Sequence, residues 1–211
     1  MTAIAEKLDI SDTTEIPGIT RPMTYEEYVR SPEEWARYDI LDGYKVYRRY
    51  GKEEMASPTR QHQRLVRRIA RQFEDFVAAG LLGECFVAPC DVLIRHIPLK
   101  SRQPDVLLIS QERLGQNLPD DSPAPLDPAP ELVVEIISPS ERPGQRTAKL
   151  SDYHHVDVRE VWQVFAETKT IEVISLTEDA IETVGTYKSG ESIVSVTFPG
   201  LIVAVDALFE E

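Results

Sequence analysis

The chain has 211 residues and 42% hydrophobic composition, a size that buries one substantial core and favours a single domain. Its formal net charge of −13 argues against a protein that coats nucleic acid non-specifically, because each neutralised phosphate needs a local cation. A local basic stripe can still serve a globally acidic protein. The sequence contains no stretch near the roughly 18 to 20 apolar residues that cross a bilayer, and no basic segment followed by an apolar run opens it. We therefore expect a soluble, cytoplasmic protein.

The N-terminal part divides into a leader and the start of the domain. Residues 1–22 combine small, charged and β-breaking types without a sustained period, which predicts a flexible leader before a single domain over 23–211. The segment Thr24-Tyr-Glu-Glu27 fits a capping box and predicts a short helix through about Arg30. Ser31-Pro-Glu-Glu34 repeats that pattern.

A hairpin and a long helix follow. The segment RYDILDGYKVYRR alternates like two strands around Asp42-Gly43, a pair whose tolerance of positive φ suits a tight turn. Ser57 and Pro58 supply an N-cap and a first-turn proline for a helix that ends at Gly80. At 100° per residue, His62 projects into the middle of the apolar stripe of this helix. That stripe consists of Leu65, Val66, Ile69, Phe73, Phe76 and Val77.

Four arginines fall together on the opposite side of the same helix: Arg60, Arg64, Arg67 and Arg71. A row of charges on a helix is normally a solvated face. Its uninterrupted positive sign in an acidic protein also fits a track for nucleic-acid phosphates. Both interpretations stay open.

The two cysteines, Cys85 and Cys90, lie in a strand-like run from Glu84 to Arg95. Five residues of extended chain would separate them by roughly 17 Å and place them on opposite faces, so we expect no disulfide between them. Without a histidine partner at zinc-ligand spacing, they also predict no structural zinc site, and we interpret them as small buried hydrophobic residues.

The remaining elements predict an α/β fold. Strands are expected at Asp105–Ile109 and 131–138, with a proline-rich loop over 115–130 between them and a second helix over about 146–155. Four further runs predict consecutive strands: REVWQVFA, TIEVISL, AIETVGTY and SIVSVTFPGLIVAV. We therefore expect a central mixed sheet flanked by the helix over 58–79 and the shorter helix around Lys149.

Two carboxylates interrupt otherwise apolar strands. Asp105 opens PDVLLIS, and Glu135 stands inside LVVEII. A carboxylate flanked by Val134 and Ile136 is costly to desolvate unless a cation, metal or proton compensates it. If the two strands are neighbours, both carboxylates can converge on one hard divalent cation such as Mg²⁺, which prefers oxygen ligands.

These acids belong to a longer pattern. The segments MTYEEYVRSPEEWARYDILDGYKV, SPTRQHQ, FVAPCDVLI, QPDVLLIS, ELVVEIISPS and AKLSDYHHVDVREVWQV together resemble the Uma family, a branch of the PD-(D/E)XK, or restriction-endonuclease-like, superfamily. The resemblance covers roughly Met23 to Phe209. It implies a restriction-endonuclease-like core, with Asp105 and Glu135 as metal-binding acids.

The resemblance also implies roles for other residues, with one departure from the superfamily pattern. A lysine often stands two residues after the second acid, but this chain has Ile137 there. The resemblance implies that Lys149 replaces it from the next helix, with Tyr153 one turn further on the same face. It also implies a site role for His62 and, more weakly, an additional metal-ligand role for Asp39. Gln145 stands where relatives carry aspartate.

Each of these residues also has a structural interpretation. Asp105 could cap a turn after Pro104, and Asp39 could brace the hairpin. Lys149 could be an ordinary helix-surface lysine. His62 could be a core histidine whose hydrogen bonds are satisfied.

The leading hypothesis is a Mg²⁺- or Mn²⁺-dependent DNA endonuclease. Its cation would be held by Asp105 and Glu135 and would activate water for phosphodiester hydrolysis, with Lys149 orienting that water and His62 assisting. The alternative is a non-catalytic nucleic-acid or protein-binding module on the same scaffold, which the acidic charge favours. A homodimer that pairs strands of the C-terminal half is compatible with both.

Overall fold

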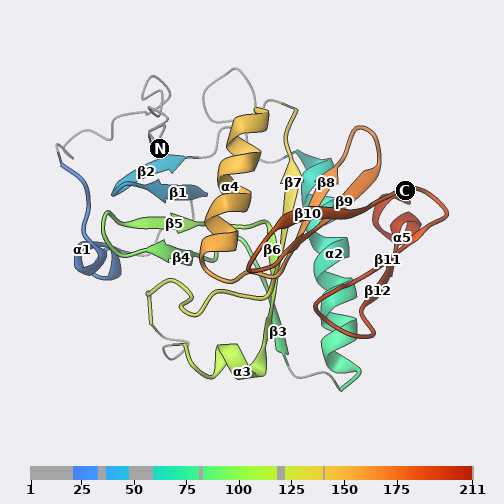
Figure 1. Cartoon of the computed structure of the whole chain (residues 1–211), viewed down its shortest axis with the longest axis horizontal. Helices are drawn as coiled ribbons and strands as arrows, with labels where there is room; N and C mark the ends of the chain where they lie inside the picture. The colour runs from blue at the N-terminus through green and yellow to red at the C-terminus, as the bar shows by residue number, and fades with distance from the viewer. Residues whose placement is uncertain are drawn as a thin grey trace.

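The structure is a computed structural model that describes residues 21–32, 37–47, 59–80, 83–117, 122–139 and 141–210 (Figure 1). Almost all of the predicted leader lies outside these residues, as do Ser57, Pro58 and Glu34. The leader and the domain boundary at Met23 therefore stay predictions.

Helix α1 (Tyr25–Val29) begins with the capping box that the sequence predicts. The Glu27 backbone N–H donates to the Thr24 hydroxyl at 3.2 Å, and the Thr24 backbone N–H donates to the Glu27 carboxylate at 2.9 Å. Arg30 caps the other end. The predicted short helix through Arg30 is confirmed.

Six strands form a mixed sheet at the centre of the molecule: β3 (Gly83–Val87), β6 (Val106–Ser110), β7 (Leu132–Ile137), β8 (Glu160–Phe165), β9 (Thr170–Leu176) and β10 (Ile181–Tyr187). Their order is β10-β9-β8-β7-β6-β3. β7 and β8 are parallel, and the other neighbours are antiparallel. Parallel neighbours need a crossover connection, which α4 (Pro143–His155) supplies. The predicted α/β class with a central mixed sheet is confirmed.

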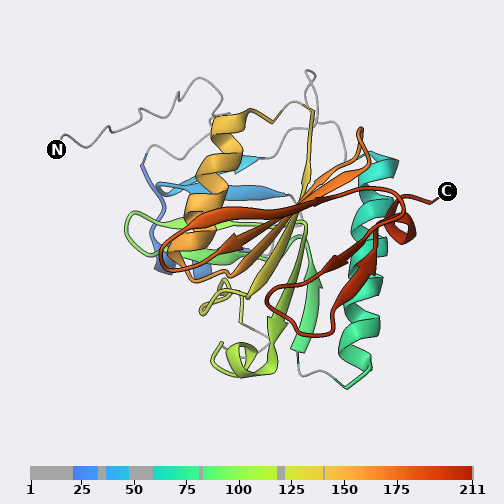
Figure 2. The same cartoon turned by 45° about the vertical axis from the view of Figure 1, so that its right-hand side comes forward.

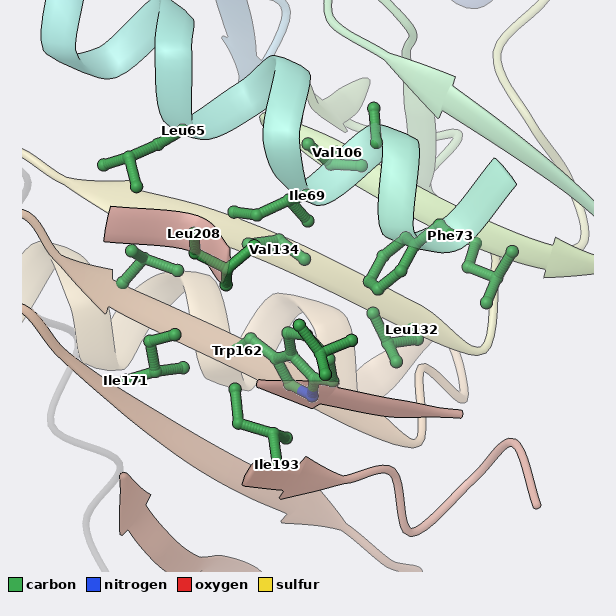
Figure 3. Close-up of a cluster of buried hydrophobic side chains, with 14 of the residues drawn as sticks. Leu65, Ile69, Phe73, Val106, Leu132, Val134, Trp162, Ile171, Ile193 and Leu208 are labelled. Carbon is green, nitrogen blue, oxygen red and sulfur yellow. The ribbon is translucent and has the colours of Figure 1, made fainter. Parts of the chain in front are cut away.

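Both faces of this sheet are covered, as expected for a strand such as β7, in which all six residues are buried. Helix α2 (Arg60–Ala78) packs on one face, where the Phe73 and Trp162 rings meet edge to face with centroids 5.3 Å apart (Figure 3). Helix α4 packs on the other face through Tyr153, beside Val133 and Val161. The two predicted flanking helices are thus confirmed (Figures 1 and 2).

A second, four-stranded sheet contains β1 (Tyr38–Leu41), β2 (Tyr44–Tyr47), β4 (Val92–Arg95) and β5 (Lys100–Arg102), in the order β2-β1-β5-β4. The predicted hairpin is confirmed, because β1 and β2 pair across a turn in which Asp42 and Gly43 have φ of 51° and 85°. A Cβ at Gly43 would stand 2.9 Å from the Met23 carbonyl oxygen, so this position requires glycine.

Two predicted boundaries are wrong. Helix α2 has Thr59 as its N-cap, because the Thr59 hydroxyl accepts the backbone N–H of His62 at 3.1 Å, and the helix begins at Arg60. Helix α4 begins three residues earlier than expected, with Pro143 in its first turn. Proline suits that position, since its missing N–H would have no helical partner there.

The run from Glu84 to Arg95 is also not one strand. It divides into β3, in the six-stranded sheet, and β4, in the four-stranded sheet, with Pro89 between them. Proline cannot donate to a strand ladder, and this segment passes from one sheet to the other at that point. The sequence analysis also missed two short helices, α3 (Gln111–Leu114) and α5 (Val205–Phe209).

The C-terminal strands are shorter than the apolar run predicts and form a separate hairpin of β11 (Ser192–Val194) and β12 (Ile202–Ala204). Glu160 on β8 attaches this region to the sheet. Its buried carboxylate accepts from the Trp162 indole and the Ser195 hydroxyl at 2.6 Å each, and from the backbone N–H of Thr197 at 2.9 Å. Within the described part of the chain, no helix is long and apolar enough to span a membrane.

Cys85 and Cys90 are both free thiols and pack against different hydrophobic clusters, on the α2 and α4 sides of the sheet respectively. Burial raises the pKa of each thiol to about 12. Because a thiolate is the reactive form, both side chains are held in their unreactive, protonated state at neutral pH.

We expect native Cys85 and Cys90 to react with a disulfide reagent such as DTNB at pH 8 on the order of 10³-fold more slowly than an exposed thiol, since the thiolate fraction is that much smaller. The absorbance of released thionitrobenzoate measures the rate. The same protein in denaturant should react fully and rapidly. Fast labelling of two thiols in the native protein would contradict the burial of these side chains.

Candidate metal and nuclease site

Asp105 lies directly before β6 and is 1% exposed. Its Oδ2 atom accepts the backbone N–H of Ile136 at 2.6 Å, while its Oδ1 atom accepts a hydrogen bond from Arg37 and lies 3.1 Å from the His62 Nε2 atom. Three separate elements therefore hold this carboxylate: the strand β7, the first turn of α2, and the residue before β1. His62 is buried, as predicted, and faces the candidate site.

Glu135 lies in β7 and is 2% exposed. The Tyr153 hydroxyl donates to its Oε1 atom at 2.6 Å, and the Lys149 ammonium donates to its Oε2 atom at 2.9 Å. Lys149 and Tyr153 are four residues apart on α4, so they share one face of that helix. The Lys149 Nζ atom also lies 2.8 Å from the Glu141 carboxylate. Lys149 is thus not a free surface lysine.

The strand register brings the two acids to the same end of neighbouring strands. Val106 pairs with Val134, and the Asp105 backbone N–H donates to the Val134 carbonyl at 3.0 Å. Asp105, directly before β6, therefore lies beside the part of β7 that contains Glu135. Ile137, where the superfamily often has lysine, points to the same side of the sheet as Glu135 because side chains alternate along a strand. Lys149 reaches that side from α4.

Asp39 belongs to a neighbouring buried ion-pair network that the sequence analysis did not foresee. Its carboxylate accepts from Arg102 at 3.0 Å and from the backbone N–H of Gln103 at 3.1 Å. Arg102 also donates to Asp152 at 2.6 and 2.8 Å, and Lys100 donates to Asp152 at 2.5 Å. Burial works to lower the pKa of Arg102, but Asp39 and Asp152 outweigh it, and the pKa is raised. Arg102 is therefore a buried permanent cation.

This network connects the four-stranded sheet to the helix that carries Lys149. Asp152 lies three residues after Lys149 and directly before Tyr153, on the same side of α4. Arg102 holds Asp152 from β5, and so it fixes how α4 presents its lysine and tyrosine to Glu135. The local sequence offered one signal: two cations alternate with Ser101 in a short strand, one residue before the Pro-Asp pair.

Arg37 is the other site residue that sequence reasoning missed. It contacts Asp105 and donates to the Gln103 carbonyl at 3.0 Å, and Gln103 in turn accepts the backbone N–H of Tyr38 at 3.0 Å. Gln145, which by the family resemblance stands where relatives carry aspartate, is exposed, and its side-chain oxygen accepts the backbone N–H of Arg142 at 2.9 Å. It stabilises the start of α4.

The donor set suits a hard divalent cation in its chemistry. Asp105 and Glu135 offer carboxylate oxygens, and Mg²⁺ is commonly held by one or two carboxylates while it keeps several waters. Among the described residues, no group of three or more histidine, cysteine, aspartate or glutamate side chains stands together as a complete metal site. The two acids fit a cation that takes most of its ligands from water and substrate.

A mixed sheet with helices on both faces, carrying a Pro-Asp pair and a second acid on the next strand, defines a protein of the restriction-endonuclease-like fold. The chain belongs to the Uma2 family, whose model, described as "Putative restriction endonuclease", matches residues 25–206. The resemblance predicted from the sequence is confirmed.

Among solved structures, the chain is similar to a "putative nuclease belonging to DUF820" from Anabaena variabilis ATCC 29413. The TM-score is 0.66 at 16% sequence identity, and the match covers 89% of this chain and 98% of that chain. At this identity the likeness shows the fold. No curated protein matches the sequence.

Substitution of Arg102 by methionine should destabilise the protein by about 3–5 kcal/mol, because it leaves two buried carboxylates without their shared cation. Urea unfolding followed by circular dichroism measures the change. The matched control is Arg95→Met, which removes an ion pair to Asp42 whose side chains are 42% and 48% exposed, and which should cost less than about 1 kcal/mol. Equal losses of unfolding free energy in the two variants would show that the buried network stabilises the protein no more than the exposed Arg95–Asp42 pair does.

Proposed function

We propose that this protein is a divalent-metal-dependent DNA endonuclease, with Asp105 and Glu135 as the protein ligands of Mg²⁺ or Mn²⁺. The observation that carries this proposal is the pair of buried carboxylates at the same end of neighbouring strands, with the Lys149 ammonium 2.9 Å from one of them. The membership in a family described as a restriction endonuclease supports it.

Hydrogen bonds within the chain fix both carboxylates in position. The backbone N–H of Ile136 fixes Asp105 in place, and the Tyr153 hydroxyl fixes Glu135. Such prior hydrogen bonds orient an acid without the cost of arranging it at the moment of reaction. A bound divalent cation would supply Lewis acidity and would lower the pKa of a coordinated water.

Lys149 stands between Glu135 and Glu141, which hold its ammonium beside the candidate site. There it would orient the attacking water and offset the negative charge that develops on a phosphate. His62 would steady Asp105 from the start of α2. A metal-ligand role for Asp39 stays a prediction, and its contacts to Arg102 and Gln103 favour a supporting role.

A second candidate function is a binding module that keeps the nuclease scaffold without its chemistry. The observation in its favour is that each carboxylate already has a cationic side chain beside it, Arg37 at Asp105 and Lys149 at Glu135. Those cations can neutralise the acids without a metal. A homodimer and a cytoplasmic location remain predictions under either function.

The nuclease proposal predicts that the protein nicks supercoiled plasmid DNA with Mg²⁺ or Mn²⁺, and that Asp105→Asn and Glu135→Gln each lower the rate by at least about 100-fold. Both substitutions remove a ligand charge with little change of shape. Calorimetric titration with Mn²⁺ should show binding by the parent protein and a loss of binding in both variants.

The control is Glu182→Gln on the exposed strand β10, which removes the same charge far from the site in sequence and leaves the rate unchanged. Thermal melting confirms that each variant is folded. Undiminished nicking by folded Glu135→Gln would overturn the site assignment. Metal binding and cleavage both absent from the parent protein would favour the binding module.

Lys149→Met should separate metal binding from chemistry. We expect kcat to fall by about 100-fold while the Mn²⁺ affinity stays within about 3-fold of the parent, because the ammonium acts on water and phosphate and is not a ligand. Single-turnover cleavage and calorimetry measure the two quantities. A parallel loss of kcat and of Mn²⁺ affinity would instead show that Lys149 acts by positioning Glu135.

A further inference from the structure

The arginine stripe of α2 consists of Arg60, Arg64, Arg67 and Arg71, all of them exposed. At 100° per residue, these four side chains fall within an arc of about 60°, and at 1.5 Å per residue they extend over about 16 Å. The opposite side of the helix is buried through residues such as Leu65 and Ile69. The stripe therefore faces away from the core.

Among the described residues, only one arginine of this stripe has an acidic partner. No carboxylate of the described residues forms an ion pair with Arg60, Arg64 or Arg67. Arg71 lies 3.8 Å from Asp75, and both of those side chains are largely exposed, at 78% and 68%. The neighbouring Arg68 differs, since it donates to the Leu208 carbonyl at 2.9 Å and supports the packing of α5.

The placement of the arginine stripe also works against the stability of α2. Successive members are three or four residues apart, so like charges are neighbours on the helix, which costs roughly 0.2–0.5 kcal/mol for each pair. Cations favour the C-terminal end of a helix, yet the first turn of α2 holds no acid and the acids Glu74 and Asp75 stand near its other end. The stability of α2 therefore does not explain this arrangement of arginines. Binding of an anion from outside the protein explains it.

The arginine stripe begins in the helical turn that carries His62, and Arg60 and His62 project about 160° apart around the helix axis. Arg60 is the first residue of α2, and His62, in the same turn, lies 3.1 Å from Asp105. In a chain of net charge −13, this is a local run of positive charge on an exposed helix face. Clusters of one sign on a protein surface raise the local concentration of oppositely charged substrates.

We propose that the arginine stripe is a track that binds the phosphate backbone of nucleic acid. This inference rests on the proposed nuclease function for its substrate class. A strand of duplex DNA carries one phosphate per 3.4 Å along the axis, so about 16 Å of stripe faces roughly five phosphates. Guanidinium groups bind phosphate through paired N–H donors, and such contacts carry no sequence information.

The test is the salt dependence of DNA binding, measured by fluorescence anisotropy with a labelled duplex in EDTA, so that no cleavage occurs. The slope of log Kobs against log salt is negative, and each lost phosphate contact makes it less steep by about 0.9. Each lost contact also lowers the affinity at 0.1 M salt by about 10-fold. The salt dependence of the triple variant R60Q/R64Q/R67Q should therefore be less steep than that of the parent by about 2.7 in slope. Its melting temperature should equal or exceed that of the parent, since like-charge repulsion is removed.

The matched control is R30Q/R95Q/R159Q, which makes the same change in net charge at three exposed arginines outside α2. It should bind DNA with the slope of the parent protein. Equal slopes for the two triple variants, or no duplex binding by the parent protein, would overturn the track. Binding in EDTA is measured independently of cleavage. A parent that binds through the stripe but does not cut would contradict the nuclease and leave the track intact.

Discussion

Buried negative charge is the constraint on which the arrangement of this protein depends. Asp105, Glu135, Asp39 and Asp152 are all buried. A carboxylate removed from water must meet a cation or several hydrogen-bond donors. The compensating groups come from segments far away in the chain, so each ion pair also joins two elements. The residue before β1, the strand β5 and the helix α4 are held in register by the acids they neutralise.

Much of the fold follows from local patterns. The six buried residues of β7 and the turn at Asp42-Gly43 have strong signals, because their burial and backbone requirements are written in neighbouring residues. The break at Pro89 was harder to foresee, since the apolar run continues on both sides of it while the chain changes sheet. Helices α3 and α5 have four and five residues, too few for a helical period to show.

The candidate site divides in the same way. Glu135 is recognisable from its apolar neighbours alone, and the pairing of Lys149 with it agrees with the family resemblance. The supporting cations Arg37 and Arg102 were missed because their partners lie 68 and 50 residues further along the chain. No periodicity reports such a pair. The pairing of β1 with β5 brings Arg102 to Asp39, and the packing of α4 brings it to Asp152.

Helix α4 has two tasks at once: it is the crossover between two parallel strands, and it carries the ammonium that contacts Glu135. The sheet topology therefore places α4 over one face of the sheet. The side chain of Ile137 points to the same face. A lysine can consequently approach the same carboxylate from the strand or from the helix without any change of backbone. In this scaffold a lysine can therefore reach the acid from more than one position in the sequence. The lysine of a motif defined by residue spacing can be absent while a lysine still lies beside the acid in space.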